Sequence, residues 1–413
     1  YKIVQWGKGM ETYPLLRKGL AVGIIFLFVW TCIIPATAQV IEKPALPTSR
    51  GNWLYVGGSG PNNYTKIQDA INDSVNGDTV FVYDDSSPYY ENIVVDKSIH
   101  LIGENKTTTI IDGSIGGDVV SVCADGVTIC EFSIQYHCTY PSSGISIYAN
   151  HSCISNTIIS SSNWVGILLM SSCDTRIVGN SISNKYVGIL LLGISNNNTI
   201  TGNDITNNSY GVEIETSSFN HIYYNNFINN TVHASDTTDN MWNSEYPSAG
   251  NYWDNYTGID ALWGQNQDTN GSDGVGDTPV SIPGGENQDR YPLMEPYTTT
   301  QLAFGLSFGG FGISGKIKNV GDTTAYRVCW RVTFTGGFIL FGRDTLRVIP
   351  KPLLPGEEVV VKSNMILGFG KVQLTMMFWA DNAPYISGNW SATVLLFFII
   401  GITNRSVYGL VRE

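Results

Sequence analysis

The sequence has few charged residues. Asp, Glu, Lys and Arg make up only 14% of its 413 residues, whereas about a quarter is usual in globular proteins. Coiled coils, charged helical bundles and disordered acidic tails need many more charges, so the composition excludes them. Basic residues are the scarcer sign, 23 against 35 acidic residues, and the net charge is −12. Because phosphate binding needs clustered Lys and Arg, we expect no nucleic acid among its partners.

Long apolar runs are also scarce, and the one near the N-terminus has the pattern of an export signal. Arg17 and Lys18 precede an uncharged run at 19–34, and the small residues at 36–38 offer a cleavage site. We therefore expect a signal peptide at 1–38, a linker at 39–50 and a protein that is secreted or held at the cell surface; an uncleaved anchor is the alternative. Asn-x-Ser/Thr acceptor sites recur, so the exported chain is expected to be a glycoprotein where its host glycosylates.

A repeat of about 23 residues dominates the middle of the chain. Within each unit, short alternating apolar stretches are separated by Ser, Asn and Gly, which is strand periodicity. The Leu-x-x-Leu-x-Leu spacing of leucine-rich repeats is absent. The pattern predicts a right-handed parallel β-helix, a pectin-lyase-like solenoid in which coils stack at about 4.8 Å. The repeat begins, in successive units, at Gly144-Ile145, Gly166-Ile167, Gly188-Ile189 and Gly211-Val212.

Equivalent positions in successive coils should form columns. We expect an inward apolar column and an amide ladder at one turn, in which each side chain bonds its neighbours above and below. The predicted apolar column is Ile158, Ile182, Ile205 and Ile228, and the predicted ladder is Asn156, Asn180, Asn203 and Asn226.

The two ends of the β-helix, expected at 51–297, need caps because an open end exposes unpaired strands. Thr65 and Gln68 have capping-box spacing before apolar residues at helical spacing, and Gly77 follows. We therefore predict a capping helix at 65–76. Residues 241–297 are rich in aromatic residues, Asp and Gly, and are predicted to form an irregular closing cap.

The remainder, 298–413, has only strand patterns and is predicted to be an immunoglobulin-like β-sandwich. Turns are expected at Gly336-Gly337 and Pro355-Gly356. The apolar stretch from Leu395 to Ile400 is too short for a membrane span, so we expect it to be a buried last strand.

Several motifs resemble the NosD-like β-helix proteins, whose repeats are described as carbohydrate-binding and sugar-hydrolase repeats. The resemblance implies the fold over about 50–297. Its functional implications are broad, because the family includes a copper-associated periplasmic maturation factor and archaeal and bacterial surface proteins. Lys318-Asn-Val-Gly321 and Leu354-Pro-Gly-Glu357 resemble adhesion-related immunoglobulin-like modules. The NosD-like motifs are Trp53-Leu-Tyr-Val-Gly-Gly-Ser-Gly60, Lys66-Ile-Gln-Asp-Ala-Ile71, Gly250-Asn-Tyr-Trp-Asp-Asn-Tyr256, Asp273-Gly-Val-Gly-Asp277 and Tyr291-Pro-Leu293.

Three aromatic residues lie just before the repeat glycines. Trp164, Tyr186 and Tyr210 should occupy the same corner of successive coils. Such a row could bind successive sugar units, since ring faces pack against the apolar faces of sugars. The alternative is a stack that only holds the turn together.

Few acidic residues are placed for catalysis. Glu213 and Glu215 alternate on a predicted strand and form the best candidate acid pair. The alternative, a solvated strand face, is an ordinary feature of β-structure. We therefore expect no catalysis, with a polysaccharide lyase, hydrolase or epimerase as the second hypothesis.

An Asp-rich segment of the closing cap is spaced like a calcium loop. It has oxygen ligands at alternate positions and Gly where the chain turns, but lacks the Glu of an EF-hand. A calcium site and an ordinary polar turn are both open. The candidate ligands are Asp268, Asn270, Ser272, Asp273 and Asp277. Copper is not expected, because the spacing of His and Cys matches no standard motif.

The sequence therefore predicts an exported β-helix protein that binds polysaccharide or another cell-envelope glycan, with a C-terminal domain that contacts other surface proteins. A copper-associated role like that of NosD is a further alternative, implied by the resemblance alone.

Overall fold

The computed structural model describes residues 51–408 apart from 114–115, 137–141, 161–162 and 308–311. The predicted signal peptide at 1–38 and linker at 39–50 lie outside the described residues. The described chain forms a parallel β-helix followed by antiparallel sheets, which confirms the predicted fold class. In this part of the chain, no helix has the length and apolar character needed to cross a membrane.

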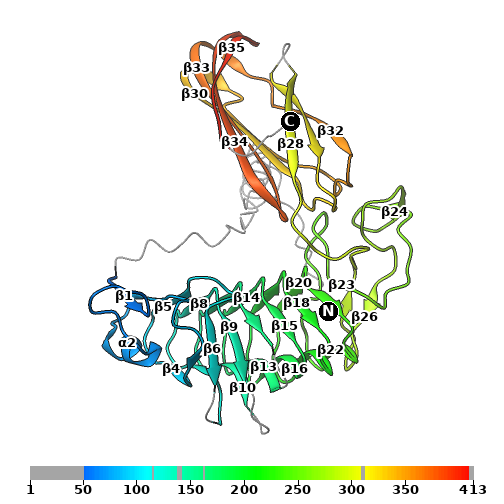
Figure 1. Cartoon of the computed structure of the whole chain (residues 1–413). Coiled ribbons are helices and arrows are strands. Elements are labelled where there is room, and N and C mark those ends of the chain that lie inside the picture. Colours follow the sequence, from blue (N-terminus) through cyan, green and yellow to red (C-terminus); the bar gives the residue numbers. More distant parts are fainter. Residues whose placement is uncertain (1–50, 114–115, 137–141, 161–162, 308–311, 409–413) are drawn as a thin grey trace, which may run out of the picture. The chain divides into compact units, whose positions relative to one another are not determined.

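Three parallel sheets form the walls of the β-helix, and each complete coil between its two ends contributes one strand to each wall (Figure 1). Sheet A contains β1 (Trp53–Val56), β2 (Thr79–Val82), β5 (His100–Gly103), β8 (Thr128–Cys130), β11 (Cys153–Ser155), β14 (Arg176–Val178), β17 (Thr199–Thr201) and β20 (His221–Tyr223). Sheet B contains β3 (Tyr89–Tyr90), β6 (Ile110–Gly113), β9 (Ser133–Tyr136), β12 (Ile158–Ile159), β15 (Ser181–Ser183), β18 (Asp204–Thr206), β21 (Asn226–Ile228) and β23 (Tyr252–Trp253). Sheet C contains β4 (Ile93–Val95), β7 (Val120–Val122), β10 (Ser143–Ile147), β13 (Asn163–Met170), β16 (Lys185–Leu192), β19 (Tyr210–Ile214) and β22 (Val232–Asp236).

The interior is a continuous column of aliphatic side chains. On sheet B the stacked inward residues are Ile134, Ile159, Ile182, Ile205 and Phe227. The predicted column was therefore right at its centre and wrong by one residue at both ends. Ile158 and Ile228 are only half-buried, because side chains alternate across a strand and a shift of one residue moves the side chain to the other face.

Polar columns fill all three corners between the sheets, where the sequence predicted one. Each side-chain oxygen accepts a bond from the preceding coil, so the buried polar atoms are satisfied without charge. The A–B corner column is Thr157, Asn180, Asn203, Asn225 and Asn251. The B–C column is Lys185, Asn208 and Asn230. The C–A column is Ser152, Thr175, Asn198, Asn220 and Asn240.

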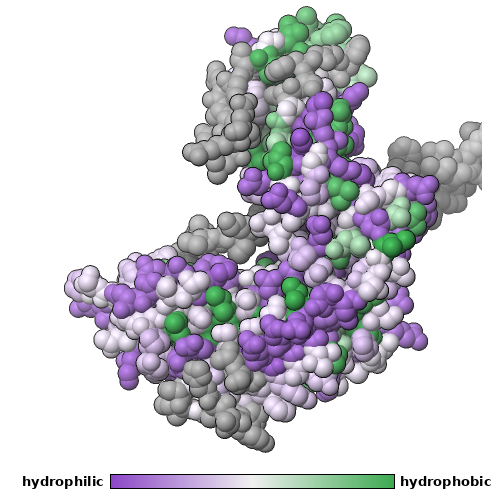
Figure 2. Space-filling model, turned by 45° about the vertical axis from the view of Figure 1, so that its right-hand side comes forward, coloured by the Kyte–Doolittle hydropathy of each residue, from purple (hydrophilic) through white to green (hydrophobic). Residues whose placement is uncertain are grey.

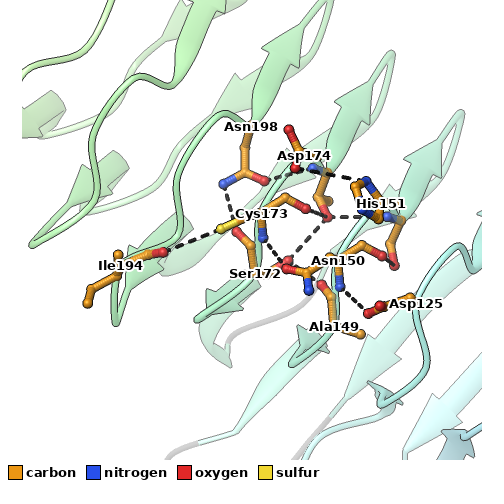
Figure 3. A network of polar contacts seen from close by, with 11 residues as sticks. Asp125, Ala149, Asn150, His151, Ser172, Cys173, Asp174, Ile194 and Asn198 are labelled. Carbon is orange, nitrogen blue, oxygen red and sulfur yellow. Dashed lines mark hydrogen bonds and ion pairs between the residues drawn. The ribbon is translucent and has the colours of Figure 1, made fainter.

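Two members of the predicted ladder lie outside these columns. Asn156 has a positive φ of 49°, and its side chain bonds Glu131 and Lys106. Asn226 begins β21 and donates to Asp204 at 2.7 Å. A second layer of bonds runs beside the C–A column, where Cys173 N donates to Asn150 Oδ1 at 2.8 Å (Figure 3).

Lys185 takes the place that asparagines hold in the following coils. Its backbone N–H donates to Asn208 Oδ1 at 2.9 Å, and its Nζ donates to Ser160 O at 3.0 Å. Asn208 Nδ2 donates to Ile182 O, which is equivalent to Ile159 O and so lies one residue before the position that Lys185 reaches. Burial lowers the pKa of Lys185 to about 8. The amine therefore acts as a long replacement for an amide donor.

The N-terminal helix α2 (Ile67–Asp73) buries Ile67, Ala70 and Ile71 in the first coils. It is shorter than the predicted 65–76, and the predicted capping box does not form. The N-cap is Lys66, which makes no side-chain cap bond, and the Glu91 carboxylate accepts from Ile67 N at 2.8 Å and Gln68 N at 3.0 Å. A carboxylate from the next coil thus caps the helix.

Two buried tryptophans and two buried aspartates close the other end of the β-helix. Trp242 Nε1 donates to Asp236 at 2.8 Å, and Trp253 Nε1 donates to Asp289 at 2.9 Å. The Trp253 ring stacks on Phe227 with centroids 4.4 Å apart. Antiparallel pairs extend this region: β24 (Leu262–Trp263) with β25 (Thr269–Asn270), and β26 (Val280–Ser281) with β27 (Gln288–Asp289).

The C-terminal residues form two antiparallel sheets that share one apolar core. Sheet D contains β28 (Leu302–Ser307), β29 (Ser314–Asn319) and β32 (Glu358–Lys362). Sheet E contains β31 (Asp344–Val348), β30 (Cys329–Phe341), β33 (Leu367–Ala380), β34 (Ala383–Leu396) and β35 (Phe398–Tyr408).

Two local predictions for these sheets are wrong. Gly336 and Gly337 are not a turn but lie within β30, at a register shift that their positive φ angles of 81° and 59° allow. The stretch 395–400 is not one buried strand. It contains the turn between β34 and β35, and Leu395, Leu396, Phe398 and Ile400 are exposed.

Candidate functional site

The predicted aromatic column lies at the start of three adjacent strands of sheet C. Trp164 and Tyr186 are exposed by 51% and 43%, while Tyr210 is half-buried. The Trp164 and Tyr186 rings stack with centroids 4.5 Å apart and planes at 23°, and the Tyr210 ring meets Tyr186 edge-on at 5.6 Å. The structure therefore brings the three rings together. Because the Trp164 and Tyr186 rings overlap, a ligand can contact only their edges and outer faces.

A second aromatic surface lies on the outside of sheet A and was missed in the sequence. Trp53 and Tyr55 alternate along β1, Phe81 lies beside Tyr55 on β2, and Tyr83 follows β2. The Trp53 and Tyr55 rings are inclined at 26° with centroids 6.2 Å apart, and Tyr55 and Tyr83 at 25° and 6.1 Å. At these separations the rings overlap little, so their faces remain available. The alternation of Trp53 with Tyr55 was the available signal.

The candidate acid pair consists of two carboxylates that form no ion pair with a cation in the part of the chain that the structure describes. Glu213 is half-buried on β19, opposite Leu190 and Ser235, and Glu215 is exposed just after the strand. Burial and the charge of Glu215 raise the pKa of Glu213. A raised pKa beside an ionised carboxylate is a property of acid–base pairs, but it also results from simple crowding.

Replacing Glu213 by glutamine is therefore expected to stabilise the protein slightly at pH 7. The gain is about 0.5 kcal/mol or less, because solvent screens a half-exposed pair. Since the folded pKa is raised, the cost of ionisation is absent at low pH and grows as the pH rises, so the gain should vanish near pH 4. Urea unfolding at pH 7 and at pH 4 measures this gain in stability, with Glu215→Gln as the matched variant. A less stable Glu213→Gln protein at pH 7 would show that Glu213 has a favourable partner.

The candidate calcium ligands lie in the closing cap, and backbone or side-chain donors engage several of them. Asp277 accepts from Ala261 N and Leu262 N at 3.1 Å, and the buried Asp273 accepts from Tyr246 Oη at 3.0 Å and Val275 N at 3.1 Å. Ser272 Oγ donates to Asp260. Asp268 and Asn270 are exposed. These bonds organise the loop, and calcium binding there stays a prediction.

Copper requires imidazole or sulfur donors that converge. In the described ranges, no group of three or more His, Cys, Asp or Glu side chains is placed to hold a metal ion, and the five described cysteines are free thiols. His151 Nδ1 lies 3.9 Å from Asp174, whereas Cys173 Sγ is directed to Ile194 O (Figure 3). The described donors do not fit a copper site.

Residues 71–258 match the model of the family described as "Periplasmic copper-binding protein (NosD)". The match lies within the β-helix, so this part of the chain is a NosD-family domain. No curated protein matches the sequence.

Among solved structures the similarities are distant. An alginate lyase from Paenibacillus sp. str. FPU-7 is 14% identical, with 49% of this chain and 77% of that one covered and a TM-score of 0.30. Pectin methylesterase from carrot is 15% identical, with 51% and 79% covered and a TM-score of 0.31. A periplasmic alginate epimerase is 17% identical, with 45% and 43% covered and a TM-score of 0.28.

Proposed function

We propose that this chain is an exported glycan-binding protein, without catalytic activity of its own, whose β-helix holds polysaccharide on its outer aromatic surfaces. The observation that carries the proposal is the exposure of large aromatic rings on two of the three walls, Trp53 with Tyr55 on sheet A and Trp164 with Tyr186 on sheet C. Aromatic side chains exposed to water are buried when the apolar face of a sugar covers them, and this burial favours binding.

The rigidity of the walls supports this function. Each ring lies on a strand that hydrogen-bonds to a neighbouring coil, so its position is fixed before a ligand arrives. Pre-ordered contact residues bind with a smaller loss of conformational entropy. Neighbouring rings also follow the coil repeat, which suits a ligand with its own repeat.

The proposal includes export of the chain, with catalysis on polysaccharide as the alternative to simple binding. The family description names periplasmic proteins, which supports export of this chain. A lyase, hydrolase or epimerase would need more than Glu213 and Glu215, since among the described residues no cation forms an ion pair with either carboxylate. Catalysis therefore remains the alternative.

The proposal is tested by incubating the protein with a panel of acidic and neutral polysaccharides, measuring retention and product formation together. We expect retention without products. The double variants Trp53→Ala/Tyr55→Ala and Trp164→Ala/Tyr186→Ala should each weaken binding by about tenfold, if each ring contributes about 0.5–1.5 kcal/mol.

The matched control is Tyr385→Ala, which removes an exposed aromatic residue from β34, outside the β-helix. It should bind as the wild type does. Equal retention by wild type and both double variants would reject the aromatic surfaces, and release of oligosaccharides would favour the enzyme hypothesis.

A further inference from the structure

An apolar row crosses one end of sheet E on its outer face. Phe338 lies opposite Phe369, Phe369 opposite Leu395, and Leu395 opposite Phe398. Directly opposed residues in antiparallel strands point to the same face. All four are exposed, by 64%, 46%, 50% and 46% respectively. They therefore form a continuous row across β30, β33, β34 and β35, which we call the apolar tip.

The outer face is most apolar at this end, and only separate exposed apolar residues such as Leu346 and Tyr385 lie farther along it. The next row contains Lys371, Thr393 and Ile400, and the row beyond it contains Thr335, Gln373 and Ser391. In Figure 2 hydrophobic residues gather at the top of the C-terminal sheets, whereas hydrophilic and hydrophobic residues are mixed below. The outer face thus changes from apolar to polar within about two residues of strand, roughly 7 Å.

The charges beside the apolar tip are positive in a chain that is acidic overall. The segments 334–343, 363–378 and 387–402 contain no Asp or Glu, and their two charged residues are Arg343 and Lys371, both exposed. The nearest acid along the chain, Asp344, is neutralised by Arg331 at 2.7 Å. An apolar row with cationic residues beside it is complementary to a partner that has an apolar interior beneath an anionic surface layer.

We propose that the apolar tip docks on a lipid membrane, with the Phe338–Phe398 row between the lipids and Arg343 and Lys371 at anionic headgroups. The backbone suits this environment, because the strands of the tip pair with one another through Leu395 and Phe398 and so keep their polar groups bonded. Aromatic and aliphatic side chains flanked by Lys and Arg are the usual residues of interfacial membrane contacts. The inference goes beyond glycan binding and does not rest on it.

The test is flotation of the full chain with vesicles of phosphatidylcholine alone or mixed with phosphatidylglycerol. We expect the wild type to float with the mixed vesicles and less with phosphatidylcholine, and salt to weaken the difference. Phe369→Ser/Phe398→Ser should lower the partition coefficient by at least about tenfold. Lys371→Gln should reduce binding to the mixed vesicles only.

The matched control is Leu346→Ser, which removes an exposed apolar residue from the same face of sheet E away from the tip. It should float as the wild type does, and thermal unfolding shows that every variant is folded. Repeating the comparison without residues 1–38 removes any contribution of the apolar run at 19–34. The proposal is overturned if the wild type does not float, if the double variant floats equally, or if the tip instead pairs two copies in solution.

Discussion

Replacing Asp289 by alanine is expected to lower the free energy of unfolding by about 4 kcal/mol, because several buried donors would lose their acceptor. The fully buried Asp289 carboxylate accepts from Asn251 N at 2.7 Å, Trp253 Nε1 at 2.9 Å and Tyr291 N at 3.0 Å. Water cannot replace it without opening the closing cap. Urea unfolding followed by tryptophan fluorescence measures the loss.

The control is Asp268→Ala, in the same cap but exposed, whose carboxylate accepts a long 3.4 Å bond from Thr269 Oγ1. It should change stability by less than about 0.5 kcal/mol. Similar losses for both variants would show that Asp289 does not hold the cap.

The pH dependence of Asp289→Asn gives a second measure of the same carboxylate. Burial raises the pKa of Asp289 to about 7 from its ordinary 3.8, although the surrounding donors lower it. The folded protein therefore binds this proton more tightly, and its contribution to stability is full below about pH 4 and falls by up to about 1.4 kcal/mol per pH unit toward pH 7. The stability difference, wild type minus Asp289→Asn, should be smaller at pH 8 than at pH 5.

Replacing Asn203 by alanine is expected to cost about 3 kcal/mol, since it interrupts the A–B column in the middle of the stack. The buried Asn203 Nδ2 donates to Ile177 O at 2.9 Å and Asn225 Oδ1 at 2.8 Å, and its Oδ1 accepts from Asn180 N at 2.9 Å. Alanine removes all three bonds, and Asn225 Oδ1 keeps only its bond from the backbone N of residue 203 at 3.1 Å. The midpoint of urea unfolding reports the loss.

Two companion variants separate hydrogen bonding from other effects. Thr206→Ala changes a half-buried outward residue of the next strand, β18, and should be nearly neutral. Asn203→Asp keeps the acceptor and loses the donors, so it should also be destabilising. If Asn203→Ala unfolded at the wild-type midpoint, the column would be packing rather than a source of stability.

The repeat period was enough to predict the parallel β-helix, because a 23-residue unit of short strands has few other ways to bury its apolar face. It was not enough to fix the register at the ends. There the corner positions hold Thr157 and Lys185 as well as asparagines. A prediction based on asparagine alone therefore chose Asn156, whose side chain lies outside the column.

Surface features were harder to predict than the repeat. Trp53 and Tyr55 lie before the region where the period is clear, so no equivalent residues in later coils pointed to them. The apolar stretch at 395–400 was predicted to be buried because hydrophobic character alone does not reveal a turn. The structure turns it between Leu395 and Phe398, and both side chains are exposed.

The bonds from one side chain to the next in the corner columns all run in one direction. From Asn180 each side-chain amide donates to the oxygen of the next coil, as far as Asn251. The A–B column then ends on Asp289 and the C–A column on Asp236, whose oxygens accept the last bonds of the two columns and which have no amide N–H to donate further. The B–C column begins on Lys185, which donates and cannot accept. Two columns therefore end at acidic side chains of the closing cap, so a coil added beyond them would find no side-chain amide to donate to its own oxygen.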